Sequence, residues 1–277
     1  SDSYRNKEGV YYTPQKIVRD LFTLDSIDVS NAIFCDPCCG SGNFLIRALE
    51  LGFRPENLHG YDVDPVAVEL TKKRISEASD FVTHNIKEAN FLEVCTLPNP
   101  PLFDYIYTNP PWGKKLSKEL KESYGEVLHA GRSLDTCALF FFGCLNCLKK
   151  NGKLGLLLPE SFFNISTFEC ARIQALSTSV ECLVDYDKPF KGLVTKANAI
   201  VLSKRKSRND GKVECSIRET RFKRKLKSFS CNPKSILNLN CTAEDSAVIT
   251  HVMAIPHTTL ANQAEWGLGI VTGNNKK

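Results

Sequence analysis

The residues best suited to chemistry lie in the segment Asn109-Pro110-Pro111-Trp112. It follows an apolar run, residues 103–108, which we predict to be a buried strand. Two successive prolines end strand pairing, because each lacks an N–H and has a fixed φ. The strand tip therefore presents a carboxamide, rigid carbonyl groups and a large aromatic ring. This set suits a flat ligand whose amino group is held and whose face is stacked. Taken alone, however, the segment is better interpreted as a rigid turn that binds nothing.

A glycine-rich turn, DPCCGSGNF at residues 36–44, precedes this segment in the chain. Residues 32–36 are predicted to form a short buried strand before it, and residues 45–51 an amphipathic helix after it. This order opens an α/β sheet, in which ligands bind at the carboxyl ends of the strands. Gly40 and Gly42 would let the backbone approach a ligand closely. The turn matches neither the dinucleotide GxGxxG pattern nor the phosphate-binding P-loop.

A second predicted strand, residues 57–61, leads into an acid. Asp62 stands where nucleotide-binding α/β folds carry a carboxylate that accepts the ribose hydroxyls. Asp64 precedes a predicted helix at residues 65–78, which begins with proline. We therefore assign Asp64 to the helix N-cap and only Asp62 to a ligand.

The third predicted strand lies within residues 81–93 and carries Asn90 near its tip. In a parallel sheet, the carboxyl ends of the strands meet at one edge. The polar side chains of Asp36, Asp62, Asn90 and Asn109 are therefore expected to converge there. Such a set could hold the polar atoms of a nucleotide-like ligand beside the Asn-Pro-Pro-Trp segment.

The remaining pattern completes an α/β chain. We expect Thr13 to be the N-cap residue, and Pro14 the first residue, of a covering helix at the N-terminus. The polar stretch 113–132 is long enough to be a loop that grips a substrate. We predict helices at 135–150, 168–177 and 244–253, and strands at 153–158, 180–186 and 197–202. With the four strands above, the predicted sheet has seven strands.

Composition is that of an ordinary globular protein of 277 residues, 42% hydrophobic and 24% charged. No apolar run approaches the length of a membrane span, so we expect a cytoplasmic protein with no membrane contact. The twelve cysteines are scattered through predicted core elements and are expected to be reduced thiols. Cys35/Cys38 and Cys144/Cys147 have CxxC spacing, but core and loop thiols are favoured over a shared zinc site, and we predict no metal.

Positive charge is concentrated in residues 204–227, which contain eleven Lys or Arg and three acids, a net charge of +8. The whole chain carries +5, so the remainder carries 5 − 8 = −3. A basic cluster of this kind attracts phosphate groups. We expect the segment to form strands or a hairpin. It could equally be a solvated hairpin or linker that binds nothing.

The order of the motifs carries a family likeness. TPQKIV, DPCCGSGNF, YDVDP, NFLE, NPPW and NGKLGLLLPESF, over roughly residues 8–203, resemble the γ-type amino-methyltransferases that make N6-methyladenine in DNA. They are similar to the catalytic parts of type I modification subunits and type IIG restriction–modification enzymes. The resemblance implies a Rossmann-like S-adenosylmethionine-dependent methyltransferase fold, with a seven-stranded, mostly parallel sheet, helices on both faces and a small C-terminal extension.

The C-terminal GLGIVTGNNKK is similar to the segment where such proteins begin their target-recognition domain. We therefore expect a methyltransferase catalytic domain at residues 1–203. Residues 204–277 are expected to be a basic extension and the start of a truncated target-recognition region.

The resemblance also implies roles for individual residues. The catalytic set would be Asn109, Pro110, Pro111 and Trp112, with the Asn109 side-chain oxygen and the Pro110 carbonyl accepting the hydrogens of the adenine amino group. Trp112 and then Phe190 would stack on the target base, although Phe190 could equally be a packed loop residue. The cofactor S-adenosylmethionine would be held by Tyr12, Thr13, Pro14, Asp36, Pro37, Cys38, Gly40, Ser41, Gly42, Phe44, Asp62, Val63, Asn90, Phe91 and Asn109. Relatives often carry Asp in place of Asn90, whose oxygen can still accept a hydrogen bond from the cofactor adenine.

Asn-Pro-Pro followed by an aromatic residue also serves enzymes that methylate protein glutamine amides or RNA base amines, since all these acceptors are planar NH₂ groups. A catalytically inactive, DNA-tethering module is a further alternative. The position of TPQKIV directly before the cofactor turn, and the likeness of the C-terminal segment, favour DNA adenine. The expected partners are double-stranded DNA and a specificity or nuclease subunit or domain.

Overall fold

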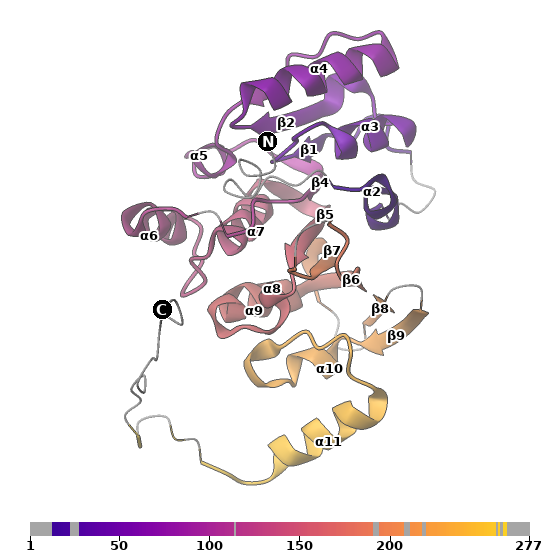
Figure 1. Cartoon of the computed structure of the whole chain (residues 1–277). Coiled ribbons are helices and arrows are strands. Elements are labelled where there is room, and N and C mark those ends of the chain that lie inside the picture. The colour runs from indigo at the N-terminus through magenta and orange to yellow at the C-terminus, as the bar shows by residue number, and fades with distance from the viewer. Residues whose placement is uncertain are drawn as a thin grey trace, which may run out of the picture. The chain divides into compact units, whose positions relative to one another are not determined.

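The computed structural model describes residues 13–22, 28–113, 115–190, 194–207, 211–217, 220–258, 260 and 263–264 (Figure 1). The chain forms two compact units, Ser1–Asn240 and Cys241–Lys277. Among the described helices, only α11 (Ala243–Ala254) belongs to the second unit, and it begins with a capping box between Thr242 and Asp245. The sheet and the candidate site belong to the first unit.

The described part of the first unit is built on a nine-stranded sheet with the order β3-β2-β1-β4-β5-β7-β6-β8-β9 (Figure 1). The strands are β1 (Phe34–Asp36), β2 (Leu58–Asp62), β3 (Ile86–Glu88), β4 (Phe103–Thr108), β5 (Leu148–Pro159), β6 (Thr178–Asp185), β7 (Ala197–Lys206), β8 (Lys212–Ile217) and β9 (Thr220–Lys225). Strands β1 to β5 pair in parallel, β7 is antiparallel to both neighbours, and β9 is antiparallel to β8. The strand order reverses between β1 and β4, the point at which open α/β sheets bind ligands.

The sheet has two more strands than the seven we expected, and the basic segment supplies both. In β8, Val213 and Cys215 are buried whereas Lys212 and Glu214 are exposed, the alternation of a half-buried strand. Strands or a hairpin were expected in this segment, but they were not counted in the sheet. The compact unit therefore continues to Asn240, because β8 is hydrogen-bonded to β6. The functional boundary after residue 203 stays a prediction.

Helices cover both faces of the sheet, as predicted. One face packs against α2 (Gln15–Leu21), α3 (Asn43–Glu50) and α4 (Pro65–Ser79). The other packs against α5 (Phe91–Cys95), α6 (Lys118–Val127), α7 (Thr136–Cys147), α8 (Ser161–Asn164), α9 (Glu169–Ser177) and α10 (Lys227–Ser230), and the 3-10 turns are Pro55–Asn57, Ser166–Phe168 and Pro233–Ser235. Every residue of helix α7 except Asn146 is buried, because the helix contacts the sheet and three neighbouring helices. Within the described ranges, no helix combines the length and apolar character needed to cross a membrane.

The two predicted helix caps have different outcomes. Asp64 caps α4 as predicted, and its carboxylate accepts a hydrogen bond from the Val66 amide at 2.9 Å. Helix α2 instead has Pro14 as its N-cap residue and no side-chain cap. The prediction that Thr13 caps this helix is therefore wrong, because Pro14 occupies the half-helical position itself.

Two other elements differ in extent from the prediction. The third strand is limited to β3, because Asn90 ends it by capping α5. The stretch 113–132 is not a continuous loop. It contains α6, whose N-terminus is capped by Ser117.

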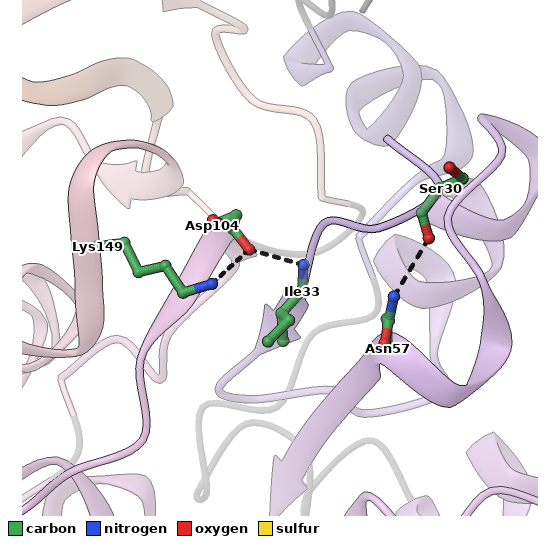
Figure 2. A network of polar contacts seen from close by, with 5 residues as sticks. All are labelled: Ser30, Ile33, Asn57, Asp104 and Lys149. Carbon is green, nitrogen blue, oxygen red and sulfur yellow. Dashed lines mark hydrogen bonds and ion pairs between the residues drawn. The ribbon is translucent and has the colours of Figure 1, made fainter. Parts of the chain in front are cut away.

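A polar network fixes the register of β1 against β4, at the edge opposite the carboxyl end of β1 (Figure 2). The Asp104 carboxylate accepts a hydrogen bond from the Ile33 amide at 2.9 Å and lies 2.8 Å from the Lys149 ammonium. Asn57 Nδ2 donates to the Ser30 carbonyl at 3.2 Å in the same network. Because β1 contains only three residues, these contacts add to a short ladder of strand hydrogen bonds.

Candidate active site

The turn between β1 and α3 is shaped by positive φ angles. Gly40 and Gly42 have φ values of 49° and 80°. A Cβ atom at Gly42 would lie 3.0 Å from the Thr71 side chain, so another residue has neither the conformation nor the room. The Thr71 hydroxyl, on α4, donates to the Gly40 carbonyl at 2.9 Å. A neighbouring helix therefore helps to hold the turn, and nothing in the sequence singled out Thr71.

Asp62 lies at the tip of β2 and holds the same turn. Its carboxylate accepts hydrogen bonds from the Gly40 amide at 2.8 Å and the Asp64 amide at 3.0 Å. A carboxylate can accept hydrogen bonds at about four positions. The Asp62 carboxylate can therefore accept hydrogen bonds from further donors. The neighbouring Val63 is 55% exposed, which leaves an apolar side chain beside the carboxylate. An acid next to an exposed apolar side chain suits a nucleoside, which combines a diol with a flat base.

The N-terminal segment reaches the turn through Asn43, a residue that sequence reasoning missed. Asn43 Nδ2 donates to the Thr13 carbonyl at 2.9 Å, and its Oδ1 accepts from Arg74 at 2.9 Å. Arg74 also donates to the Ser41 carbonyl. The structure thus brings residue 13 to the turn, across 30 positions of sequence. Tyr12 lies outside the described residues.

Asp36 and Thr108 are buried polar residues at the carboxyl ends of the central strands β1 and β4. Asp36 is 1% exposed and accepts a hydrogen bond from the Cys38 amide at 3.1 Å. Burial raises the pKa of Asp36 to about 7, although the nearby Thr108 hydroxyl offsets part of this effect. Neither Asp36 Oδ2 nor Thr108 Oγ1 completes a hydrogen bond of good geometry within the described chain. Two buried polar atoms at the site can therefore accept further partners.

Asn90 and Phe91 are placed differently from each other. Asn90 is half-buried; its oxygen caps α5 and its amide group donates to Glu93 at 3.1 Å. Phe91 is 1% exposed and packs against Tyr61 and Phe140, with ring centroids 5.6 and 6.2 Å away. The contact of Phe91 with a cofactor ring stays a prediction, and it requires this side chain to become more exposed.

The Asn-Pro-Pro-Trp segment leaves the end of β4, with Asn109 half-buried and Pro110 buried. Trp112 Nε1 donates to the Leu157 carbonyl at 3.4 Å, which connects the indole to β5. The Phe190 ring meets Trp112 edge to face, with centroids 5.5 Å apart and planes at 81°. Phe190 is only 7% exposed, so it is a packed loop residue and not an exposed aromatic. The two aromatic residues proposed for base stacking nevertheless lie in contact.

The other residues predicted in the turn differ in exposure. Pro37 and Phe44 are buried, whereas Cys38 and Ser41 are half-buried. Burial raises the pKa of Cys38 well above its ordinary value. All twelve cysteines are free thiols. Within the described ranges, no group of three or more His, Cys, Asp or Glu side chains could hold a metal ion.

Comparison with known proteins identifies the family. The family model described as N-6 DNA Methylase matches residues 2–241. The chain belongs to this family. This N-6 DNA methylase chain is 46% identical over 277 residues to the Type II methyltransferase M.VspI of Vibrio sp. (strain 343), an alignment that covers 100% of this chain and 68% of that protein. The predicted family and enzyme class, an adenine-specific DNA methyltransferase, are therefore confirmed.

Solved structures support the fold class. The N-6 DNA methylase chain is similar to a chain from a structure of the type I R-M system, with a TM-score of 0.63 and 20% identity, covering 74% of this chain and 44% of that one. It is also similar to the type I restriction-modification system methyltransferase subunit from Streptococcus thermophilus, with a TM-score of 0.60 and 18% identity, covering 90% of this chain and 53% of that one. At such identities the likeness shows the fold alone, and the chain spans about half of each structure.

Proposed function

We propose that this chain is the catalytic part of an enzyme that transfers a methyl group from S-adenosylmethionine to the N6 amino group of adenine in double-stranded DNA. The observation that carries the proposal is the convergence of three features at the carboxyl edge of the sheet. They are the glycine-rich turn, the Asp62 carboxylate and the Asn109-Pro110-Pro111-Trp112 segment. N6 methylation requires a site for a nucleoside-like cofactor next to residues that bind the amino group of the target base.

The residues at the turn fit S-adenosylmethionine. The spare acceptor positions of Asp62 suit the two ribose hydroxyls, and the exposed Val63 suits one face of the adenine. Gly42 gives the turn a backbone conformation that L side chains rarely adopt, and the N-terminus of α3 would present its amide groups to the methionine carboxylate. The buried Asp36 and Thr108 oxygens offer acceptors for an ammonium group. The bound cofactor supplies an electrophilic methyl group on a sulfonium.

The chain's own residues then prepare the acceptor. The N6 lone pair of adenine is delocalised into the ring and is a poor nucleophile. The Asn109 side-chain oxygen and the Pro110 carbonyl accept the two amino hydrogens and draw the nitrogen toward tetrahedral geometry. Oxygen atoms fixed where positive charge develops stabilise the transition state. Alignment of the amine with the methyl group is a proximity effect.

The target adenine must leave the duplex to reach this position. Base flipping costs a few kcal/mol, and stacking on an aromatic side chain contributes about 1–3 kcal/mol per base. Trp112 is the first stacking candidate, because it is half-buried, follows Asn109 by three residues and is held by the Leu157 carbonyl. Phe190 is the second. It covers part of Trp112, so an entering base would displace the Phe190 ring or meet its edge.

The proposed methyltransferase activity also implies binding partners for the complete protein. We infer that the complete protein acts on duplex DNA as part of a restriction–modification system and works with a specificity or nuclease subunit or domain. The support is the M.VspI relative, named as a type II methyltransferase, and structural neighbours from type I R-M systems. No finding favours a protein or RNA acceptor.

The test is to express the complete protein in a host that lacks adenine methylation and to map N6-methyladenine in its genomic DNA. Modified adenine within one short sequence motif is expected from the wild type. Asn109→Ala should lower the methylation rate by at least about 100-fold, the usual effect of removing one fixed polar partner of a transition state. A variant that methylates at the wild-type rate, or unmodified DNA from a soluble wild-type protein that binds the cofactor, would refute the proposal.

A further inference from the structure

The cations of the basic segment 204–227 fall into two groups once the segment is folded. Two of them are used inside the protein. Lys204 Nζ donates to two carbonyls at the C-terminal end of α7, at 2.6 and 2.7 Å. Arg224 lies over the Phe229 ring, 4.3 Å from its centroid, and donates to a backbone carbonyl. These two half-buried side chains account for only a small part of the charge.

Most of the remaining described cations face solvent without a partner. Five are exposed and form no ion pair within the described ranges: Lys206, Lys212, Arg221, Lys225 and Lys227. Lys223 lies 3.1 Å from Glu214, but both side chains are 63% exposed, and such surface pairs contribute little. The protein therefore does not neutralise this surface by itself.

Strand geometry gathers four of the cations on one face. Alternate residues of a strand point to the same side, so Arg221, Lys223 and Lys225 share a face of β9. Lys212 stands directly opposite Lys225 in the ladder with β8 and shares that face. We call these four residues the ribbon stripe. Like charges directly opposite each other destabilise a sheet. The Lys212–Lys225 pair therefore lowers the stability of the sheet, and a role in folding does not account for it.

The ribbon stripe begins at the catalytic edge of the sheet. Strand β8 is parallel to β6, and both β6 and β5 are antiparallel to β7, so β8 runs in the direction of β4. The end of β8 and the start of β9 therefore lie at the same edge as Asn109, and Arg221 is the second residue of β9. Lys225 is four residues further along, a distance of about 14 Å at about 3.4 Å per residue. A long polyanion seated at the catalytic edge could follow the stripe.

We propose that the ribbon stripe binds the phosphates of duplex DNA outside the target site. This inference rests on the proposed function, which supplies DNA as the polyanion at that edge. Duplex DNA carries one negative charge per about 1.7 Å of its axis, so several phosphates come within reach of a stripe of this length. Contacts to phosphate orient the duplex without reading its sequence.

A ribbon stripe that served only to keep the sheet edge soluble would behave differently. Lysines on an edge strand prevent pairing with other chains, and β9 is at the edge of the sheet formed by the described strands. If this were their whole role, their removal would promote aggregation and leave DNA binding unchanged. A stripe that bound an acidic protein partner would also leave DNA binding unchanged when it was removed.

The test measures the affinity of the 277-residue chain for a fluorescent duplex from about 50 to about 200 mM salt. The variant is Lys212→Gln/Arg221→Gln/Lys225→Gln, and the control is Lys72→Gln/Lys73→Gln/Lys87→Gln, an equal charge change on α4 and β3. Each phosphate contact adds about 0.9 to the slope of log affinity against log salt, so losing three lowers it by about 2.7. Over this fourfold rise in salt, the wild type should lose about 40-fold more affinity than the stripe variant.

The control should keep the slope of the wild type. Equal slopes for the stripe variant and the wild type, or an equal fall in the control, would overturn the proposal. If the triple variant aggregates, Arg221→Gln and Lys225→Gln alone should each lower the slope by about 0.9, and unchanged slopes would again overturn it. Asn109→Ala should lower the methylation rate by at least about 100-fold and keep the wild-type slope. A chain that shows the stripe effect but never methylates DNA would overturn only the proposed function.

Discussion

Replacing Asp62 with Ala should weaken cofactor binding and loosen the glycine-rich turn together. The carboxylate accepts bonds from the Gly40 and Asp64 amides at 2.8 and 3.0 Å, and the ribose would use its other acceptor positions. A hydrogen bond to a charged group contributes about 1.5–3 kcal/mol. The lower end of this range applies to each hydrogen bond of Asp62, because this residue is only half-buried. Two lost ribose bonds then amount to about 3 kcal/mol, or a rise in Kd of about 100-fold.

The assay is calorimetric titration with S-adenosylmethionine. Glu69→Ala is the matched control, since it removes the same charge from α4, where Glu69 is 72% exposed and forms a surface ion pair with Lys72 at 2.8 Å. Asp62→Asn should fall between Asp62→Ala and the wild type, because the amide keeps one acceptor oxygen. A Kd for Asp62→Ala within about threefold of the wild type would show that this carboxylate does not hold the ribose.

Two buried groups give further predictions. Because burial raises the pKa of Asp36 to about 7 from an ordinary 3.8, the folded protein binds this proton more tightly than the unfolded chain, and stability falls as pH rises between those values. The Tm of Asp36→Asn relative to the wild type, both without cofactor, should therefore increase from pH 5 to pH 8; a constant difference would contradict a buried ionisation. Arg172 is 0% exposed and donates to three backbone carbonyls, so Arg172→Met should lower the free energy of unfolding in urea by at least about 3 kcal/mol. The exposed Arg54→Met is its control, and equal effects of the two substitutions would mean that the carbonyl contacts are not stabilising.

The sequence predicted those features that follow from local pattern. Strand β4 spans residues 103–108 as expected, because an apolar run ends in two prolines. Asp64 caps α4 because an acid followed by proline is a local signal. The convergence of strand tips was predictable as well, since parallel strands place their carboxyl ends at one edge.

Contacts between distant segments were not predictable. The hydrogen bond from Asn43 to the Thr13 carbonyl and the packing of Phe190 on Trp112 depend on how loops cross the sheet edge. The basic segment was predicted to form strands or a hairpin, and β8 and β9 agree with this, but their place in the main sheet was not predicted. Its two strands were not counted because Val213 and Cys215 are the only buried side chains of β8. The burial of Phe91 likewise depends on α7, which follows it much later in the chain.

The network around Asp104 bears on how the site tolerates sequence change. A three-residue strand could slip by one position along its neighbour with little loss of ladder bonds, and a slip of one residue turns every side chain to the opposite face. Asp36 would then leave the site, and Cys35 would take its place. The bond between the Ile33 amide and the Asp104 carboxylate opposes this slip, and Lys149 holds that carboxylate (Figure 2). In a library of variants selected for methylation, positions 104 and 149 would therefore group with the residues of the catalytic edge, although they lie at the other end of the strands.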